Sequence, residues 1–125
     1  ANLNKSSFKI KNFSLIQSDW LSCFGENSLD VIVSNPPYIK EDDKHLHSLM
    51  HEPYEALVAP DDGLADIKTI TEQSTSILKR GGVLIYEHGY KQSDQVQEIL
   101  SNFDFRNIQS IKDYQGIKRI TYAFH

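Results

Sequence analysis

Cysteine, long apolar runs and an excess of positive charge are all scarce in this sequence, and each shortage excludes a class of protein. The 125 residues include one cysteine, so no disulfide can form within the chain, and we expect a reducing compartment. No apolar run approaches membrane-spanning length, and no signal peptide opens the chain. The formal net charge of −4 gives no electrostatic footprint for nucleic acid. We therefore expect a cytoplasmic protein with no membrane partner and no direct nucleic-acid partner.

The chain has no repeat, low-complexity tract or long linker, and its length suits one domain with one core, spanning residues 1–125. Two β-rich runs come first, "FSLIQ" at residues 13–17 and "LDVIVS" at residues 29–34. The second is nearly continuous in β-branched residues, which is typical of a strand buried on both faces. The polar residues 40–63, with two prolines, are interpreted as a long loop with room for one helical turn.

Helices and strands alternate in the rest of the chain. Apolar spacing predicts a helix over residues 66–79, stopped by Arg80-Gly81-Gly82, and a strand over residues 83–87. A helix over residues 93–102 follows, with Ser93 as its N-cap. Two strands, "FRNIQSIKDY" and "RITYAFH", are joined by a turn at Gln115-Gly116.

The predicted element order is β, β, α, β, α, β, β. Strands that alternate with helices form a mostly parallel sheet covered on both faces, whereas the two closing strands should pair antiparallel. This α/β layout resembles the Rossmann-like sheet of class I methyltransferases.

The stretch "VIVSNPPYIK" places Asn35, Pro36, Pro37 and Tyr38 directly after a predicted strand, where ligands bind in open parallel sheets. The prolines fix φ and stiffen the loop, so that the Asn35 side-chain oxygen and the Pro36 carbonyl are held as two acceptors. Tyr38 offers a ring for stacking on a planar group. These groups suit an –NH2 on a planar carbon, held for in-line displacement. The alternative is a plain Asn-Pro turn with an aromatic residue at its rim.

Several stretches together resemble the HemK/PrmC family of protein-(glutamine-N5) methyltransferases. They are "QSDW", "VSNPPYI", "EPYEAL", "DDGL", "GGVLIYEHG" and "DYQGIKRI", and their order and spacing run the length of the chain. The resemblance implies methyl transfer from S-adenosylmethionine to the glutamine amide in the Gly-Gly-Gln loop of peptide-chain release factors, which would be the protein substrate. It implies no metal.

The resemblance also implies roles for individual residues. The residues Asn35 to Tyr38 would hold the substrate glutamine, with Asn35, Pro36 and Tyr38 catalytic and Asn35 also near the methyl donor. Asp19 and Trp20 would border the adenine of the donor, the alternatives being a turn cap and a packed core indole. Glu52, next to Pro53, would line the substrate side, the alternative being an exposed acid in a loop.

Structural roles are expected for several other polar residues. Glu87, in "EHG" at the end of a strand, is expected to be a buried structural carboxylate. Gly116 and Arg119 are expected to serve the closing turn. His45, His47 and His51 have metal-ligand character, but no cysteine or carboxylate pattern supports a metal site.

Two features of the family have no counterpart in this sequence: the glycine-rich loop after the first strand and the acidic residue after the second. We therefore expect the C-terminal part of a catalytic domain, inactive by itself. Without those strands, residues 13–17 should pair with residues 29–34 or with a second copy of the chain, because exposed strand edges recruit other strands. The alternatives to the glutamine methyltransferase are an adenine amino-methyltransferase with the same loop, and a non-catalytic remnant or binding module.

Overall fold

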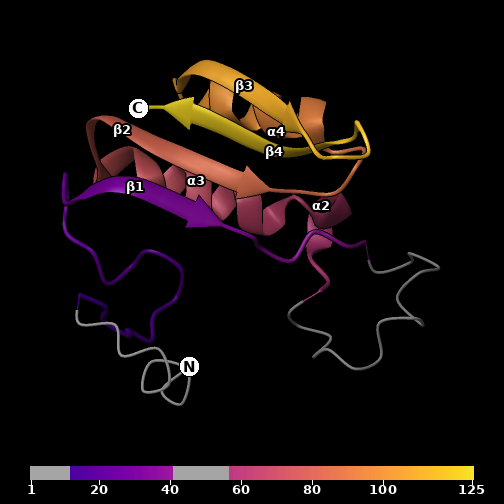
Figure 1. Ribbon diagram of the computed structural model, residues 1–125. Coiled ribbons are helices and arrows are strands. Elements are labelled where there is room, and N and C mark those ends of the chain that lie inside the picture. The colour runs from indigo at the N-terminus through magenta and orange to yellow at the C-terminus, as the bar shows by residue number, and fades with distance from the viewer. Residues whose placement is uncertain (1–11, 41–56) are drawn as a thin grey trace.

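The computed structural model describes residues 12–40 and 57–125, which form one mixed sheet with three helices (Figure 1). The strand order is β1-β2-β4-β3. In chain order the elements are β1 (Leu29–Ser34), α2 (Pro60–Gly63), α3 (Ala65–Ile77), β2 (Leu78–Glu87), α4 (Ser93–Asn102), β3 (Arg106–Lys112) and β4 (Lys118–Phe124).

The sheet contains one parallel pair and two antiparallel pairs. β1 runs parallel to β2, with Ile32 opposite Leu84, whereas β4 is antiparallel to both β2 and β3. The predicted antiparallel pair at the end of the chain is therefore confirmed, and its turn contains Gly116 at φ +81°. The parallel majority that we expected is not seen among the described strands, because β4 inserts antiparallel between β2 and β3.

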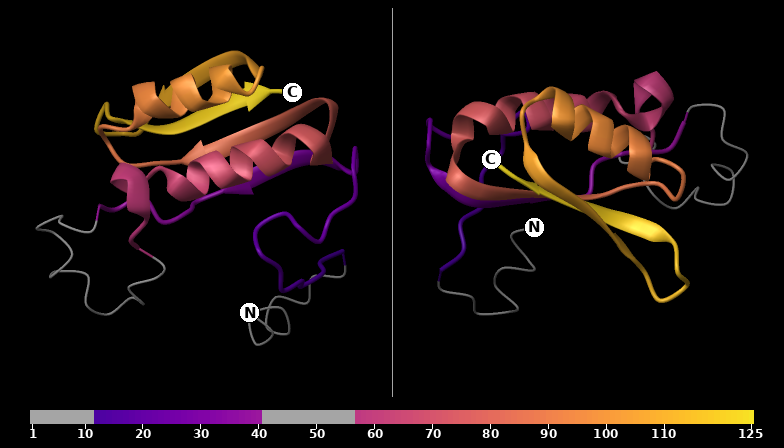
Figure 2. Two further views of the ribbon diagram at one scale, coloured as in Figure 1. Left: turned by 180° about the vertical axis from the view of Figure 1, so that it is seen from behind. Right: turned by 90° about the horizontal axis from the view of Figure 1, so that it is seen from above.

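The helices α3 and α4 lie on the same face of the sheet, as both views in Figure 2 show. Side chains that point to this face form the core, among them Ile32, Leu84 and Tyr86, which are all buried. On the opposite face Val31 and Val33 are 53% and 71% exposed. The expectation that helices cover both faces is thus wrong for the described residues, since side chains alternate along a strand and only one set meets a helix.

The boundary between α3 and β2 differs from the prediction. The helix ends at Ile77, and the strand begins at Leu78 and continues through Gly81 and Gly82. Pairing with distant segments explains this, because Leu78 is fully buried and Gly81 donates its N–H to the His125 carbonyl at 2.9 Å. Of the two glycines that suggested a helix stop, Gly82 lies close to β1, since a Cβ built on it would stand 3.1 Å from the Asp30 carbonyl oxygen.

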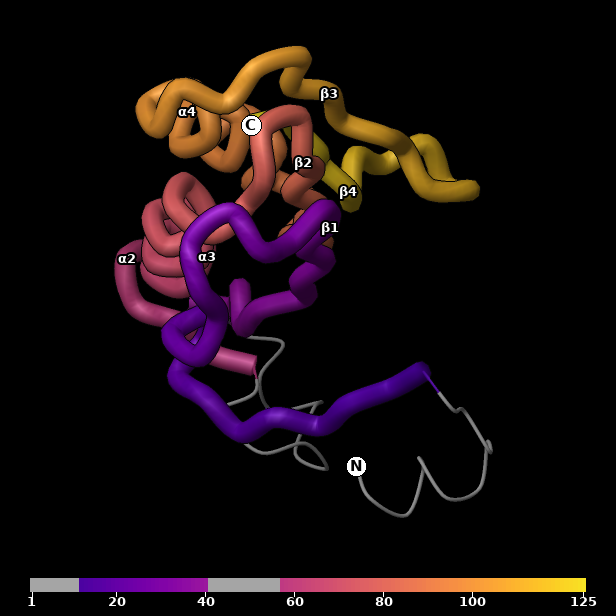
Figure 3. The backbone as a smooth tube through the Cα atoms, turned by 90° about the vertical axis from the view of Figure 1, so that its left-hand side faces the viewer, coloured from indigo at the N-terminus to yellow at the C-terminus, as the bar shows by residue number. Residues whose placement is uncertain are grey.

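Residues 13–17 form no strand, so this prediction is wrong. Figure 3 shows residues 12–28 passing below the sheet and rising beside α3 to reach β1. The segment bonds to α3, with Leu21 N–H donating to Gln73 Oε1 at 2.8 Å and Asn27 N–H to the Ser76 carbonyl at 2.9 Å. It does not pair with β1, whose strand partner within the described sheet is β2.

No helix within residues 12–40 or 57–125 combines the length and the apolar character that crossing a membrane requires.

Candidate functional site

The loop formed by Asn35, Pro36, Pro37 and Tyr38 leaves the carboxyl end of β1, where the sequence predicted it. Pro36 is buried and Asn35 is exposed. Across the described ranges, neither the Asn35 side chain nor the Pro36 carbonyl has a hydrogen-bond partner. Both oxygens therefore keep their capacity to accept a hydrogen bond, as far as the described residues go.

The far end of this loop is anchored to the segment that precedes α2. Ile39 N–H donates to the Leu57 carbonyl at 2.9 Å, and Ala59 N–H donates to the Ile39 carbonyl at 3.1 Å. These bonds form a parallel bridge between Ile39 and Val58. The loop is thus held at both ends, by β1 and by this bridge.

Gln92, just before α4, contacts the same loop through its side-chain amide. Its Nε2 donates to the Tyr38 carbonyl at 3.1 Å and to the Asp62 carbonyl at 3.0 Å. Its Oε1 accepts from the Gly89 N–H at 2.8 Å. Gly63 lies against the same loop. A Cβ built on Gly63 would collide with the Tyr38 carbonyl, and its φ of +79° is in the left-handed region that favours glycine.

A pocket of about 440 Å³ opens between this loop and the β2–α4 connection. Tyr38 and Lys40 line one side, and residues 89–92 with Arg119 line the other. The Nζ of Lys91 lies 5.2 Å and the guanidinium carbon of Arg119 lies 6.0 Å from the centre of the exposed Tyr90 ring. The pocket therefore combines aromatic surface with cationic groups beside the loop whose two acceptors have no partner within residues 12–40 and 57–125.

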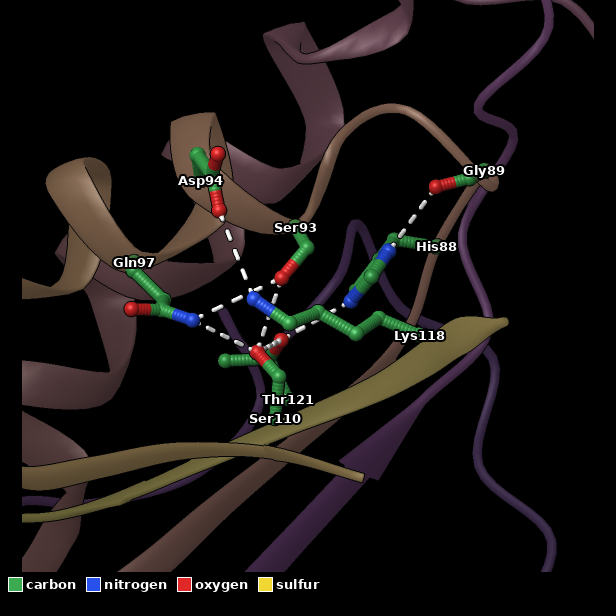
Figure 4. Close-up of polar contacts among 8 residues, drawn as sticks. All are labelled: His88, Gly89, Ser93, Asp94, Gln97, Ser110, Lys118 and Thr121. Carbon is green, nitrogen blue, oxygen red and sulfur yellow. Dashed lines mark hydrogen bonds and ion pairs between the residues drawn. The ribbon is translucent and has the colours of Figure 1, made fainter. Parts of the chain in front are cut away.

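A buried chain of hydrogen bonds lies behind the β2–α4 connection (Figure 4). His88 Nδ1 is 3.0 Å from the Gly89 carbonyl, and its Nε2 is 2.8 Å from Thr121 Oγ1. Thr121 Oγ1 is 2.7 Å from Ser110 Oγ, which is 2.9 Å from Ser93 Oγ. Because a carbonyl can only accept, the neutral ring carries its proton on Nδ1, and the Thr121 hydroxyl donates to Nε2.

Two predictions about this region are corrected. Ser93 is not the N-cap of α4, because Gln92 holds that position and the Ser93 hydroxyl bonds to Ser110 instead. Glu87 is exposed, and the buried titratable group of the "EHG" stretch is His88. Strand alternation is the reason, since Tyr86 and the buried set of β2 face the helices, which turns Glu87 outward.

The other predicted site residues lie before β1 or outside the described residues, and their proposed roles stay predictions. Asp19 is exposed, and Trp20 is partly buried against the core. Their neighbour Leu21 donates its N–H to Gln73 Oε1, which holds this segment against α3. Glu52 and Pro53, together with His45, His47 and His51, lie outside the described residues. No group of three or more metal-ligating side chains occurs within the part of the chain that the structure describes.

Comparison with known proteins first identifies the class of fold. No family model matches the chain. A methyltransferase structure from Pyrococcus furiosus aligns with 79% of this chain and 42% of its own, at a TM-score of 0.55 and 19% identity. The fold is thus that of part of a Rossmann-like methyltransferase sheet, as the sequence predicted.

The comparisons then narrow the resemblance. The release factor glutamine methyltransferase of Escherichia coli K12 is 41% identical over 123 residues, which is 97% of this chain and 44% of that protein. Its namesake from Coxiella burnetii is 37% identical over 98% of this chain and 44% of that protein. A release factor-specific protein-(glutamine-N5) methyltransferase structure from Alicyclobacillus acidocaldarius aligns with 78% of this chain and 49% of its own, at 25% identity and a TM-score of 0.53.

The predicted resemblance to the glutamine methyltransferases is therefore confirmed, over a chain that spans less than half the length of the curated relatives it matches. Gln92 was missed by sequence reasoning. Its position just before a predicted helix was visible, but its partners are backbone carbonyls of distant segments, which leave no signal in side-chain composition.

Proposed function

We propose that the protein of which this chain forms a part transfers a methyl group from S-adenosylmethionine to the side-chain amide nitrogen of the glutamine in the Gly-Gly-Gln loop of peptide-chain release factors. The observation that carries the proposal is the stiff Asn35–Tyr38 loop at the carboxyl end of β1, whose two acceptor oxygens have no hydrogen-bond partner among the described residues. Similarity to proteins named for this reaction supports the choice of substrate. The proposal places the protein in the cytoplasm.

The two acceptors would bind the two hydrogens of the substrate –NH2, one on the Asn35 side-chain oxygen and one on the Pro36 carbonyl. This arrangement aims the nitrogen lone pair away from the loop and toward the methyl group. A nitrogen–carbon bond forms as the donor's carbon–sulfur bond breaks, the electron pair leaves with sulfur, and the nitrogen then releases a proton to water. Positive charge develops on nitrogen during the attack, and the two oxygens stabilise it.

Tyr38 and the pocket beside it would receive the rest of the substrate. The ring of Tyr38 can stack on the planar amide, and about 440 Å³ is enough for a glutamine side chain with its adjoining backbone. In this proposal Pro37 keeps the ring in place, and Glu52 contributes from the substrate side.

S-adenosylmethionine supplies an electrophilic methyl group when it is bound. The described residues fit it only in part: Asn35, proposed to lie near the methyl group, is exposed, whereas Asp19 and Trp20, proposed to border the adenine, lie along a segment bonded to α3. In the proposal, therefore, the chain's own contribution to transfer is to hold the acceptor amide.

Mass spectrometry on a methylation reaction tests the proposal. The purified full-length protein is incubated with labelled S-adenosylmethionine and either a release factor or DNA. We expect one added methyl group on the glutamine of the Gly-Gly-Gln loop. Label that enters only DNA would support the adenine amino-methyltransferase instead, and no label in either substrate would support a non-catalytic protein. The chain's acidic net charge of −4 favours the protein substrate.

A further inference from the structure

Gln92 uses every donor of its side-chain amide to join three separate segments at the Asn35–Tyr38 loop. Its two N–H groups bind the Tyr38 and Asp62 carbonyls, and its oxygen binds the Gly89 N–H. The residue is 6% exposed, so water does not compete for these bonds. A single side chain therefore fixes the backbone of the loop relative to α2 and to the end of β2.

The turn that carries Gln92 is itself held at both of its ends (Figure 4). On one side His88 bonds to Thr121 of β4, and on the other side Ser93 bonds to Ser110 of β3. Thr121 and Ser110 are joined at 2.7 Å, which closes the chain of bonds beneath the turn. The β3–β4 pair thus sets the position of Gln92, and Gln92 in turn holds the Tyr38 carbonyl in place.

We propose that Gln92 is a positioning residue for methyl transfer. Proline fixes φ at positions 36 and 37, and ψ is restricted at each residue before a proline, so the stiff backbone couples the position of the Pro36 carbonyl and of the Asn35 backbone to that of the Tyr38 carbonyl. Gln92 does not contact the reacting amide in this arrangement, because both of its N–H groups are already bound to backbone oxygens. This inference rests on the proposed function and assigns Gln92 a part in it.

The variant Gln92→Glu tests the proposal with little change in shape. A carboxylate keeps the bond from the Gly89 N–H but places an oxygen against the Tyr38 and Asp62 carbonyls, where no hydrogen remains to donate. In the full-length protein we expect the single-turnover rate of methyl transfer to fall about 10- to 100-fold, since small displacements of reacting groups have effects of this size. The dissociation constant for S-adenosylmethionine should stay within about twofold of the wild-type value, because Gln92 holds the loop at Tyr38 and, of the four loop residues, only Asn35 is proposed to lie near the donor.

Two control variants separate positioning from charge and from stability. Gln95→Glu makes the same charge change on an exposed residue of α4. Thr71→Val removes a buried hydrogen bond to the Tyr86 hydroxyl, 2.9 Å long, in the core beneath the sheet. Both variants should keep the wild-type rate at a temperature where they are folded. A Gln92→Glu rate within about twofold of wild type, or an equal loss in Thr71→Val, would overturn the proposal.

Hydrogen exchange gives a readout that does not need activity. Peptides that cover Tyr38 and Ile39 should exchange faster in Gln92→Glu than in the wild type, and should be unchanged in Gln95→Glu and Thr71→Val. If the wild-type protein methylates no release factor, the proposed function fails, and the exchange data still decide whether Gln92 holds the loop. Unchanged exchange in Gln92→Glu would overturn the positioning role whatever the reaction is.

Discussion

Asn35 presents a side-chain amide that is exposed and has no hydrogen-bond partner within the described ranges, directly after a strand that is fixed in the sheet. The residue is therefore suited to bind a ligand and is not needed to satisfy the fold. This separation between function and stability at a single residue makes a clean test possible.

Asn35→Ala should reduce methyl transfer while leaving the fold intact. The change removes one acceptor for the attacking nitrogen, and loss of a comparable charge-stabilising group costs about 2.7–4 kcal/mol of activation free energy. Single-turnover kinetics on the full-length protein measures the rate, and thermal unfolding checks that the melting temperature is unchanged. Near-normal turnover would contradict the role of Asn35.

Trp20→Ala tests whether the indole borders the donor or belongs to the core. Stacking of a base on an aromatic ring contributes about 1–3 kcal/mol, so calorimetry should show weaker binding of S-adenosylmethionine if the ring borders the adenine. Trp20 is partly buried against the core, which favours a structural effect as well. An unchanged dissociation constant with a lower melting temperature would assign Trp20 to the core alone.

His88 should make stability depend on pH. Burial lowers the pKa of His88 below its usual value of 6.5, and the charges of Arg119 and Lys118 act in the same direction, whereas the Gly89 carbonyl and Glu87 oppose them. The unfolded chain therefore binds a proton more readily than the folded one. Stability should be complete above the unfolded pKa and should be lost progressively as the pH falls through 6.5 toward the folded pKa.

Thermal unfolding at about pH 7.5 and about pH 5 measures this effect. His88→Gln should show a smaller loss of melting temperature between the two conditions than the wild type. His125→Gln is a matched substitution, because that ring is exposed and contacts Phe105 at the end of the chain. An equal loss in wild type and His88→Gln would exclude His88 as the source.

At the scale of secondary-structure elements, the contact between α2 and the Asn35–Tyr38 loop depends on a missing side chain. Gly63 has φ +79°, and a Cβ there would collide with the Tyr38 carbonyl. Gly81 has nearly the same conformation, φ +80°, but nothing lies within 4 Å of the position where its Cβ would stand. Both positions thus require a positive φ, but only at Gly63 would an added Cβ collide with another atom.

Gly63→Ala should lower the free energy of unfolding by more than Gly81→Ala. In both variants, an alanine in the left-handed region lowers the free energy of unfolding by about 1–2 kcal/mol. Gly63→Ala must in addition push the loop away from α2, so it should also lower methyl transfer, whereas Gly81→Ala should not. Denaturant unfolding and single-turnover rates measure the two effects, and equal effects of both substitutions on stability and on rate would show that the close contact is unimportant.

Elements defined by local signals were predicted well from the sequence. The bounds of β1 and of α4 follow from a β-branched run and from helical spacing, and the loop after β1 was placed correctly. The start of β2 was not, because pairing of Gly81 with His125 at the other end of the chain decides it. Gln92 and the His88 chain also escaped prediction, since their partners come from strands whose register no local pattern reveals.

At the scale of the whole molecule, one face of the described sheet carries exposed apolar side chains, and the edge strands β1 and β3 each pair on one side only. Val31 and Val33 point away from the helices, and Ile111 and Ile120 are also exposed. β1 is an edge strand, with hydrogen bonds to β2 on one side. An open edge beside apolar side chains favours association with another strand or surface.

The chain of 125 residues produced by itself should therefore self-associate. Light scattering should give a mass above 14.3 kDa, increasing with concentration. Val33→Lys places a charge on the exposed face of the edge strand and should restore the monomer, since charged residues protect sheet edges. This chain should also show no turnover, as the described residues fit the donor only in part. A wild-type monomer that transfers methyl groups from S-adenosylmethionine would contradict both expectations.

The pairing of β1 with β2 also has a consequence for the order of folding. Val31 pairs with Val83, far along the chain, whereas β3 and β4 are joined by a short turn and lie close to α4 in sequence. Closing a long loop costs more chain entropy than closing a short one, so the unit from β2 to β4 should form first and β1 should dock last. The Asn35–Tyr38 loop is then the final part to take shape. It is also the first to be lost when β1 detaches, so brief local openings would switch the site off while most of the core stays folded.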